Sequence, residues 1–197
     1  MKGGLGLTIE MELVPTLSFD LYNGWVLFAF FLVNHAMIFL LSSRKTVSRL
    51  TDFDFSKWET RQRISFTIGK MFSLICIVLI LFTPLRIGSL NFWIGLVLLF
   101  LGIAGLDAAV IAFNRTPTDT PITSGPYRFS RHPQQVALFT IFAGISLAIG
   151  SWIALGAHII ARLLNSACDR AEEQACLEYY GEPYQEYLDR TPRYLLY

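Results

Sequence analysis

The chain has 197 residues, of which 53% are apolar and only 16% charged, with a formal net charge of +1. Too few charged residues are present to cover a water-soluble domain of this size, and the mean hydropathy is positive, so the composition favours an integral membrane protein. The near-neutral charge, without a dense basic patch, argues against a nucleic-acid-binding protein.

Apolar segments predict helices that cross a bilayer, because about 20 apolar residues are needed to span the hydrocarbon and only helices satisfy their backbone groups there. The fourth and fifth segments are short and meet at Gly150-Ser151, which predicts a tight helical hairpin. The five segments are 21–41, 71–85 (extended to 67 if Lys70 reaches the headgroups), 92–113, 135–149 and 152–164.

Helical structure is also expected beyond the last segment. The fifth helix is predicted to continue over 163–180, where Gly181 breaks it. Pro183 then suits the first turn of a short helix that ends at Pro192. The sequence therefore predicts an all-α, multi-pass transmembrane protein with about five spans, a C-terminal helical hairpin and a short C-terminal helix.

Basic residues in the loops predict the orientation of the spans. The loop after the second span has only Arg86, whereas the loops after the first and third spans contain Arg44, Lys45, Arg49, Lys57, Arg61, Arg63 and Lys70, and Arg115, Arg128 and Arg131. This pattern places the N-terminus outside and the C-terminus in the cytoplasm. We expect one integral membrane domain over 1–197, with three spans in 21–113 and the functional part in 114–197. Within 42–63, mixed aromatic, acidic and basic residues suggest a helix lying on the headgroups.

Polar residues within the apolar segments are candidates for interhelical contacts or for function. Asp107 lies in the third span, and intramembrane carboxylates are functional candidates by default. Asn34 and His35 in the first span are expected to hydrogen-bond to neighbouring helices, and His158 is expected to do the same from the fifth. The three cysteines lack CxxC spacing and are predicted to be free thiols, and no residue spacing predicts a metal site.

Two segments concentrate polar chemistry on the predicted cytoplasmic side. The first is the loop 121–133, which combines His132 and two arginines with turn-forming prolines. The second contains Glu172 and Glu173 on the fifth helix, where positions 165, 168, 169, 172 and 176 share a face. That face either turns toward the 121–133 loop or is solvated. The tail tyrosines form either an aromatic belt at the membrane interface, which is the favoured interpretation, or the wall of a pocket.

The ordered motifs of this region resemble the isoprenylcysteine carboxyl methyltransferase family of membrane enzymes. The residues that carry the resemblance are Thr123-Ser124-Gly125-Pro126-Tyr127-Arg128, Arg131-His132-Pro133, Glu172-Glu173, Tyr180-Gly181-Glu182-x-Tyr184-x-x-Tyr187 and Arg190-x-Pro192. They cover about the C-terminal 80 residues. The resemblance implies methyl transfer from S-adenosyl-L-methionine, with S-adenosyl-L-homocysteine as the product, in a pocket built by the last helices and the tail.

Site residues follow from the resemblance position by position. It implies cofactor contacts from Asp119, Thr120, Pro121, Ile122, Gly125, Tyr127, His132, Pro133, Gln134, Gln135 and Glu172. Glu172 and Glu173 are the expected catalytic residues, and Arg170, Cys168 and Asp107 are the candidates for substrate binding. This chain departs from the family pattern at Gln135, where the family often has Tyr, and at Cys168, where the family has an Arg that contacts the substrate carboxylate.

The implied substrate is a lipophilic molecule that enters from the bilayer, with the α-carboxylate of an isoprenylated cysteine as the leading acceptor. A phospholipid amine and a small thiol remain alternatives. Two other classes are an NADPH-dependent enzyme similar to sterol reductases and a non-enzymatic membrane scaffold. The other expected partner is the bilayer itself, and we expect a monomer.

Overall fold

The structure is a computed structural model that describes residues 8–44, 46, 47 and 58–195. Every regular element in these ranges is helical, which confirms the all-α class for the described residues. The elements are α1 (Trp25–Leu41), α3 (Thr60–Phe82), α4 (Leu90–Arg115), the 3₁₀ helix η1 (Gly125–Arg128), α5 (Pro133–Ala148), α6 (Trp152–Tyr180) and α7 (Glu182–Arg190). By length and composition α3 and α4 can cross a bilayer, and α1 and α5 are shorter apolar helices.

The second helix differs most from its predicted bounds. α3 begins at Thr60 rather than at 67 or 71, because Glu59 and Gln62 form a capping box that extends the helix through the charged residues before the apolar run. It ends at Phe82, since Thr83 precedes a proline and is extended. The helix expected on the headgroups within 42–63 falls mostly on residues 48–57, which lie outside the described residues, and residues 60–63 belong to α3.

The other predicted helices begin or end close to their expected positions. α1 begins at Trp25 rather than at residue 21, because the buried Asn23 side chain donates to the carbonyl of Ser18 at 2.6 Å and holds a turn there. The hairpin turn falls at Gly150, whose φ of 67° favours glycine, and Ser151 caps α6 by accepting from the backbone N–H of Ala154. α6 is continuous to Tyr180, as the sequence predicts.

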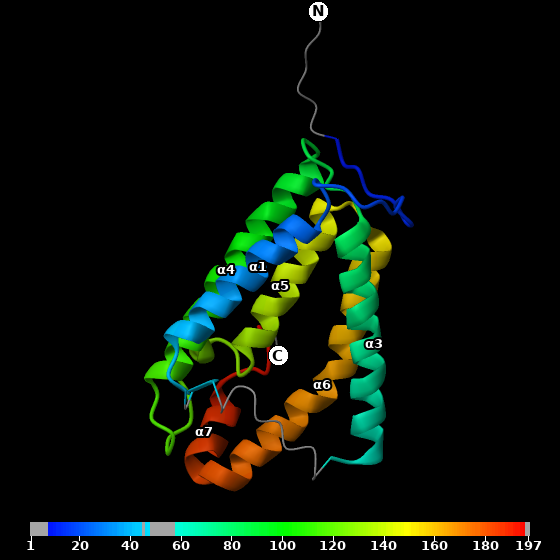
Figure 1. Cartoon of the computed structure of the whole chain (residues 1–197). Helices are drawn as coiled ribbons and strands as arrows, with labels where there is room; N and C mark the ends of the chain where they lie inside the picture. The colour runs from blue at the N-terminus through cyan, green and yellow to red at the C-terminus, as the bar shows by residue number, and fades with distance from the viewer. Residues whose placement is uncertain (1–7, 45, 48–57, 196–197) are drawn as a thin grey trace, which may run out of the picture.

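The helices form two pairs, α4 with α5 and α3 with α6, which Figure 1 shows meeting where α5 turns into α6 and diverging toward the other end. We call these the hairpin end and the tail end. At the hairpin end the N-terminal segment ties the pairs together: the N–H of Glu12 donates to the carbonyl of Gly150, and Glu12 pairs with Arg86 at 2.5 Å. At the tail end α6 runs on beneath the α4–α5 pair to α7 (Figure 1).

Polar contacts within the bundle join α1 to α4. Asn34 donates to both carboxylate oxygens of Asp107, at 3.0 and 3.1 Å, which confirms the interhelical bond expected of Asn34. His35 instead stacks its ring on Phe31, and its Nδ1 has no hydrogen-bond partner in the described part of the chain. Asp107 therefore has a structural partner on α1.

Small residues let α4 and α5 approach closely, as is common between helices in a bilayer. Gly95 on α4 faces Gly144 and Ala148 on α5. A Cβ atom at position 95 would lie 2.4 Å from the carbonyl oxygen of Gly144 and 2.7 Å from the backbone nitrogen of Ala148. Both obstacles are backbone atoms, so a side chain at position 95 requires the two helices to separate.

We expect Gly95→Ala to destabilise the protein by about 1–3 kcal/mol, because the helix pair must move apart and lose packing. Gly156→Ala is the matched control, since a Cβ atom at position 156 of α6 meets nothing within 4 Å. The control is expected to stabilise the protein by about 0.5–1 kcal/mol through helix propensity. Thermal unfolding in detergent measures both, and equal melting temperatures for the two variants would contradict the close approach of α4 and α5.

Candidate functional site

The site begins at the turn before α5, which the C-terminal tail holds in place. His132 precedes Pro133, the first residue of α5, and its side chain is 6% exposed. Its backbone N–H donates to the Ser130 hydroxyl at 3.1 Å and to the carbonyl of Arg193 at 3.2 Å. The Ser130 hydroxyl in turn donates to the same Arg193 carbonyl at 3.0 Å. The tail therefore fixes the backbone that presents the His132 ring.

Glu173 of α6 is the centre of a buried ionic cluster at the tail end. Its carboxylate accepts from Arg193 at 2.6, 3.0 and 3.1 Å and from His132 Nε2 at 3.1 Å, and it lies 3.3 Å from Arg131 Nε. Burial disfavours the charge, but the hydrogen bonds from His132 and Arg193 and the nearby Arg131 together lower the pKa of Glu173 to about 2. Glu173 is therefore ionised at neutral pH.

The side chain of Glu172, unlike that of Glu173, is exposed rather than buried. Its side chain is 61% exposed, and its Oε2 lies 3.7 Å from Nδ1 of His132. Because the ionised Glu173 can only accept, we assign a proton to Nε2 of His132. Nδ1 then faces Glu172 either as a free acceptor or, in the doubly protonated ring, as a second donor. The His132 ring thus joins a buried, fully paired carboxylate to an exposed one.

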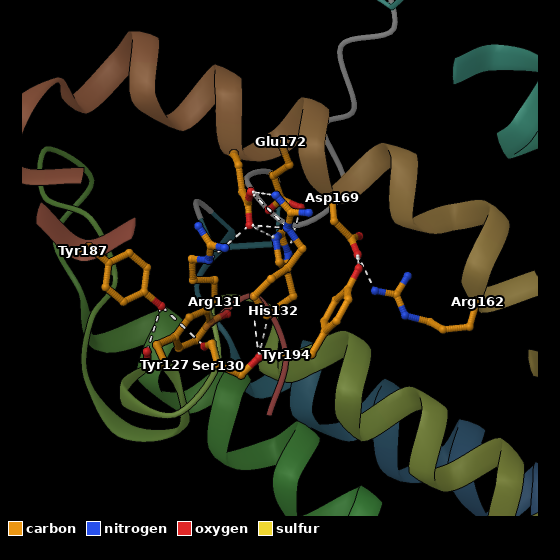
Figure 2. Close-up of polar contacts among 11 residues, drawn as sticks. Tyr127, Ser130, Arg131, His132, Arg162, Asp169, Glu172, Tyr187 and Tyr194 are labelled. Carbon is orange, nitrogen blue, oxygen red and sulfur yellow. Dashed lines mark hydrogen bonds and ion pairs between the residues drawn. The ribbon is translucent and has the colours of Figure 1, made fainter. Parts of the chain in front are cut away.

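A second polar group lies beside this cluster, and Figure 2 shows the side chains of Arg162 and Tyr194 meeting at Asp169. Asp169 of α6 accepts from the hydroxyl of Tyr194 at 2.7 Å and from Nη2 of Arg162, and the Arg162 guanidinium lies over the Tyr194 ring, 4.8 Å from its centroid. Burial and the bond to Asp169 raise the pKa of Tyr194 to about 12, so the hydroxyl keeps its proton at neutral pH. The tail therefore contacts the two buried acidic residues of α6, Asp169 through Tyr194 and Glu173 through Arg193.

Tyrosines of α7 close one side of the site rather than facing lipid. Tyr184 and Tyr187 are 7% and 2% exposed and pack with Tyr127 against the end of α4, so the predicted aromatic belt is wrong for these two residues. The Tyr187 hydroxyl donates to the Tyr127 carbonyl at 2.8 Å, and Gln134 donates to the Tyr127 hydroxyl at 3.1 Å (Figure 2 shows the Tyr187 bond). The amphipathic pattern of α7 serves internal packing at these positions.

The remaining residues predicted from the sequence differ in their burial and in their contacts with the His132–Glu173 cluster. Gly125 has a φ of 60° at the start of η1, and Ile122 packs with the tyrosines of α7. Asp107 contacts Asn34 of α1, and its hydrogen bonds do not link it to the His132 cluster. The others are the exposed Asp119, Thr120 and Arg170 and the half-buried Pro121, Gln135 and Cys168.

Two residues of the site were not predicted from the sequence. Arg162 lies within an apolar stretch of α6, and a charge in such a stretch was a readable signal of function. Arg193 lies in the tail, and nothing in its local sequence indicates the bond to Glu173, which is 20 residues away in the chain. All three cysteines lie in the described part of the chain, and none of them forms a disulfide, as expected.

Comparison with known proteins gives one match. Residues 85–183 match the sequence model of the phospholipid methyltransferase family, a region that runs from just before α4 to the second residue of α7. It contains His132, Glu172 and Glu173 but stops before Arg193. No curated protein matches the chain, and neither does any solved structure.

Proposed function

The chain belongs to the phospholipid methyltransferase family, and we propose that it transfers a methyl group from S-adenosyl-L-methionine to the α-carboxylate of an isoprenylated cysteine in the bilayer. The family and the apolar helices indicate an integral membrane methyltransferase of lipophilic substrates. The observation that supports the cofactor site in this proposal is the approach of His132 Nδ1 to the exposed carboxylate of Glu172, 3.7 Å away, inside the matched region.

The residues present suit the cofactor. Among the described residues around His132, Glu172 is an exposed carboxylate, whereas Glu173 and Asp169 are held by arginines. A free carboxylate can accept from ribose hydroxyls or offset a sulfonium charge. Tyr127 of η1 is 8% exposed and packs with Tyr184 and Tyr187, so it fixes the η1 loop that leads into the His132 turn. We propose that Glu172, His132, Tyr127 and the η1 loop hold the cofactor.

When bound, S-adenosyl-L-methionine supplies a methyl group that is already activated, so the protein needs mainly to align the acceptor and exclude water. Alignment of this kind contributes about 7–11 kcal/mol in well-oriented reactions. Glu173 is assigned a positioning role, because its carboxylate holds the His132 ring and Arg193. Glu172 is assigned to cofactor binding rather than to proton transfer.

The need for a general base favours a carboxylate over an amine as the methyl acceptor. A lipid amine has an ordinary pKa near that of lysine, about 10.4, and must lose a proton before it can attack. A carboxylate is ionised at neutral pH and needs no base. Glu173 and Asp169 are both engaged by arginines and Glu172 is assigned to the cofactor, so an amine acceptor would depend on His132 Nδ1 as its base, whereas a carboxylate acceptor needs none. The second candidate acceptor is a phospholipid amine, which the description of the matching family favours.

The membrane arrangement follows the same proposal. We propose one domain over 1–197 with five crossings, the N-terminus outside, and the 121–133 loop and the C-terminus in the cytoplasm. We also propose that the lipid reaches the site laterally from the bilayer, while the polar cofactor enters from water. We also propose that the protein is a monomer.

Binding and labelling experiments test the function in the purified full chain. Calorimetry is expected to show binding of S-adenosyl-L-homocysteine and none of a reduced dinucleotide; binding of the dinucleotide alone would support a reductase, and binding of neither would support a scaffold. A radiolabelled methyl transfer screen then compares prenylated cysteines, aminolipids and simple thiols. Label on the prenylated carboxylate is expected, whereas label on aminolipids alone would replace the proposed acceptor.

A further inference from the structure

An arginine lies deep in the apolar part of α6. Arg162 comes ten residues after Trp152, the start of the helix. At 1.5 Å per residue this is about 15 Å, or half the thickness of the hydrocarbon core. In the proposed arrangement with five crossings, a charge at this depth costs about 2.5–3.5 kcal/mol even on the most favourable scale, so it is retained only where it has a partner or a function.

The protein holds the Arg162 guanidinium rigidly from one side. Its Nη2 donates to Asp169, two turns toward the tail end, and its plane lies over the Tyr194 ring. Tyr194 donates to the same Asp169 oxygen, so the three groups fix one another (Figure 2). The Arg162 side chain is only 15% exposed. A cation fixed in this way has lost its conformational freedom before any ligand arrives.

The other side of the Arg162 guanidinium carries a hydrogen-bond donor that no described residue accepts from. Nη1 of Arg162 is buried and has no hydrogen-bond partner among the residues that the structure describes. One turn nearer the hairpin end, the His158 ring stacks on Phe139 and Phe142 at 5.1 and 5.2 Å and hydrogen-bonds the Phe139 backbone, so Arg162 provides the unpaired donor here. A buried donor left unpaired costs about 1–3 kcal/mol, and more when it is charged. An acceptor at this position would remove that cost.

We propose that Nη1 of Arg162 binds the oxyanion of the lipophilic substrate and so determines its class: a lipid with a carboxylate or phosphate headgroup. This inference rests on the proposed function, because it places the substrate headgroup between the α3–α6 and α4–α5 pairs beside the cluster. The planar guanidinium suits both oxyanions, because each has several acceptor oxygens. Asp169 and Tyr194 are positioning residues that act through Arg162. No covalent step occurs at Arg162.

Three probes with the same twelve-carbon chain test the inference: laurate, dodecyl phosphate and dodecanol. Binding is measured with the full chain in dodecyl maltoside, a detergent without an anion. The wild type is expected to bind at least one of the two anions about 10-fold or more tightly than dodecanol, and the stronger of them identifies the headgroup. Equal affinity for all three probes would overturn the inference.

Substitutions then test whether Arg162 causes the preference for the anionic probes. Arg162→Gln is expected to abolish the preference for anions and to leave dodecanol binding unchanged, while Arg162→Lys retains part of it. Arg115→Gln, which removes an exposed arginine at the end of α4, is the control that keeps the preference. Because Arg162→Gln leaves Asp169 unpaired, the double variant with Asp169→Asn provides a second test that leaves no unpaired charge at this pair. Persistence of the preference in either folded variant would overturn the inference.

Measuring cofactor binding on the same samples distinguishes failure of this inference from failure of the proposed function. Binding of S-adenosyl-L-homocysteine is measured on the same samples and is expected to be unchanged by Arg162→Gln. Loss of the anion preference with intact cofactor binding supports the headgroup site. If the wild type binds no cofactor, the proposed function fails, whereas the anion preference and its loss in the variants still decide the role of Arg162.

Discussion

Replacing Glu173 with alanine is expected to lower the free energy of unfolding by about 3–5 kcal/mol. The substitution removes the carboxylate that accepts three hydrogen bonds from Arg193 and one from His132. It leaves Arg131 and Arg193 close together, with no anion between them. Since the Glu173 side chain is only 8% exposed, water cannot replace the lost contacts at low cost. The effect is large because one side chain joins α6, the turn before α5 and the tail.

Thermal and denaturant unfolding in detergent measure this effect, with Glu186→Gln on the exposed face of α7 as the control. A double-mutant cycle with Arg193→Ala isolates the ion pair. The double variant is expected to be less destabilised than the sum of the single variants, because alanine at 193 removes one of the cations that Glu173→Ala leaves unpaired. Additive single effects would contradict a direct bond between Glu173 and Arg193.

The same cluster shows what the sequence can and cannot reveal. His132 and Glu172 were identifiable because each lies in a short motif of turn-forming and charged residues. Their environments were not, since adjacent glutamates on a helix point about 100° apart and only the tertiary packing decides which one is buried. Glu173 turns toward Arg193, which lies in a segment placed by the fold of α7. The sequence therefore predicts the location of the site but not the separate roles of the two glutamates.

The helix boundaries also show which features of the fold the sequence predicts and which it does not. The hairpin turn was predictable at Gly150 and Ser151, because a positive φ and a helix cap each require a particular residue type. The start of α3 was missed because its first turn is charged, and hydropathy gives no signal for charged residues. Glu59 and Gln62 have the capping-box spacing, so this boundary was available from the sequence by a different criterion.

Replacing Glu172 with glutamine is expected to weaken binding of S-adenosyl-L-homocysteine about 10- to 100-fold without changing the melting temperature. The proposed contact with the cofactor is a charge-assisted hydrogen bond, worth about 1.5–3 kcal/mol, and glutamine removes its charge while keeping its size. Stability should be unaffected, because the Glu172 side chain is 61% exposed and no arginine among the described residues pairs with it. Calorimetry in detergent measures the affinity.

The matched control is Glu182→Gln, which removes an exposed carboxylate at the start of α7 and is expected to leave cofactor binding unchanged. The two adjacent glutamates are therefore expected to affect different quantities. Substitution at position 173 changes the free energy of unfolding, and substitution at position 172 changes the affinity for S-adenosyl-L-homocysteine. Wild-type affinity in Glu172→Gln would remove this carboxylate from the cofactor site. A large loss of stability in the same variant would show instead that Glu172 is part of the buried cluster, because an exposed carboxylate does not have that effect.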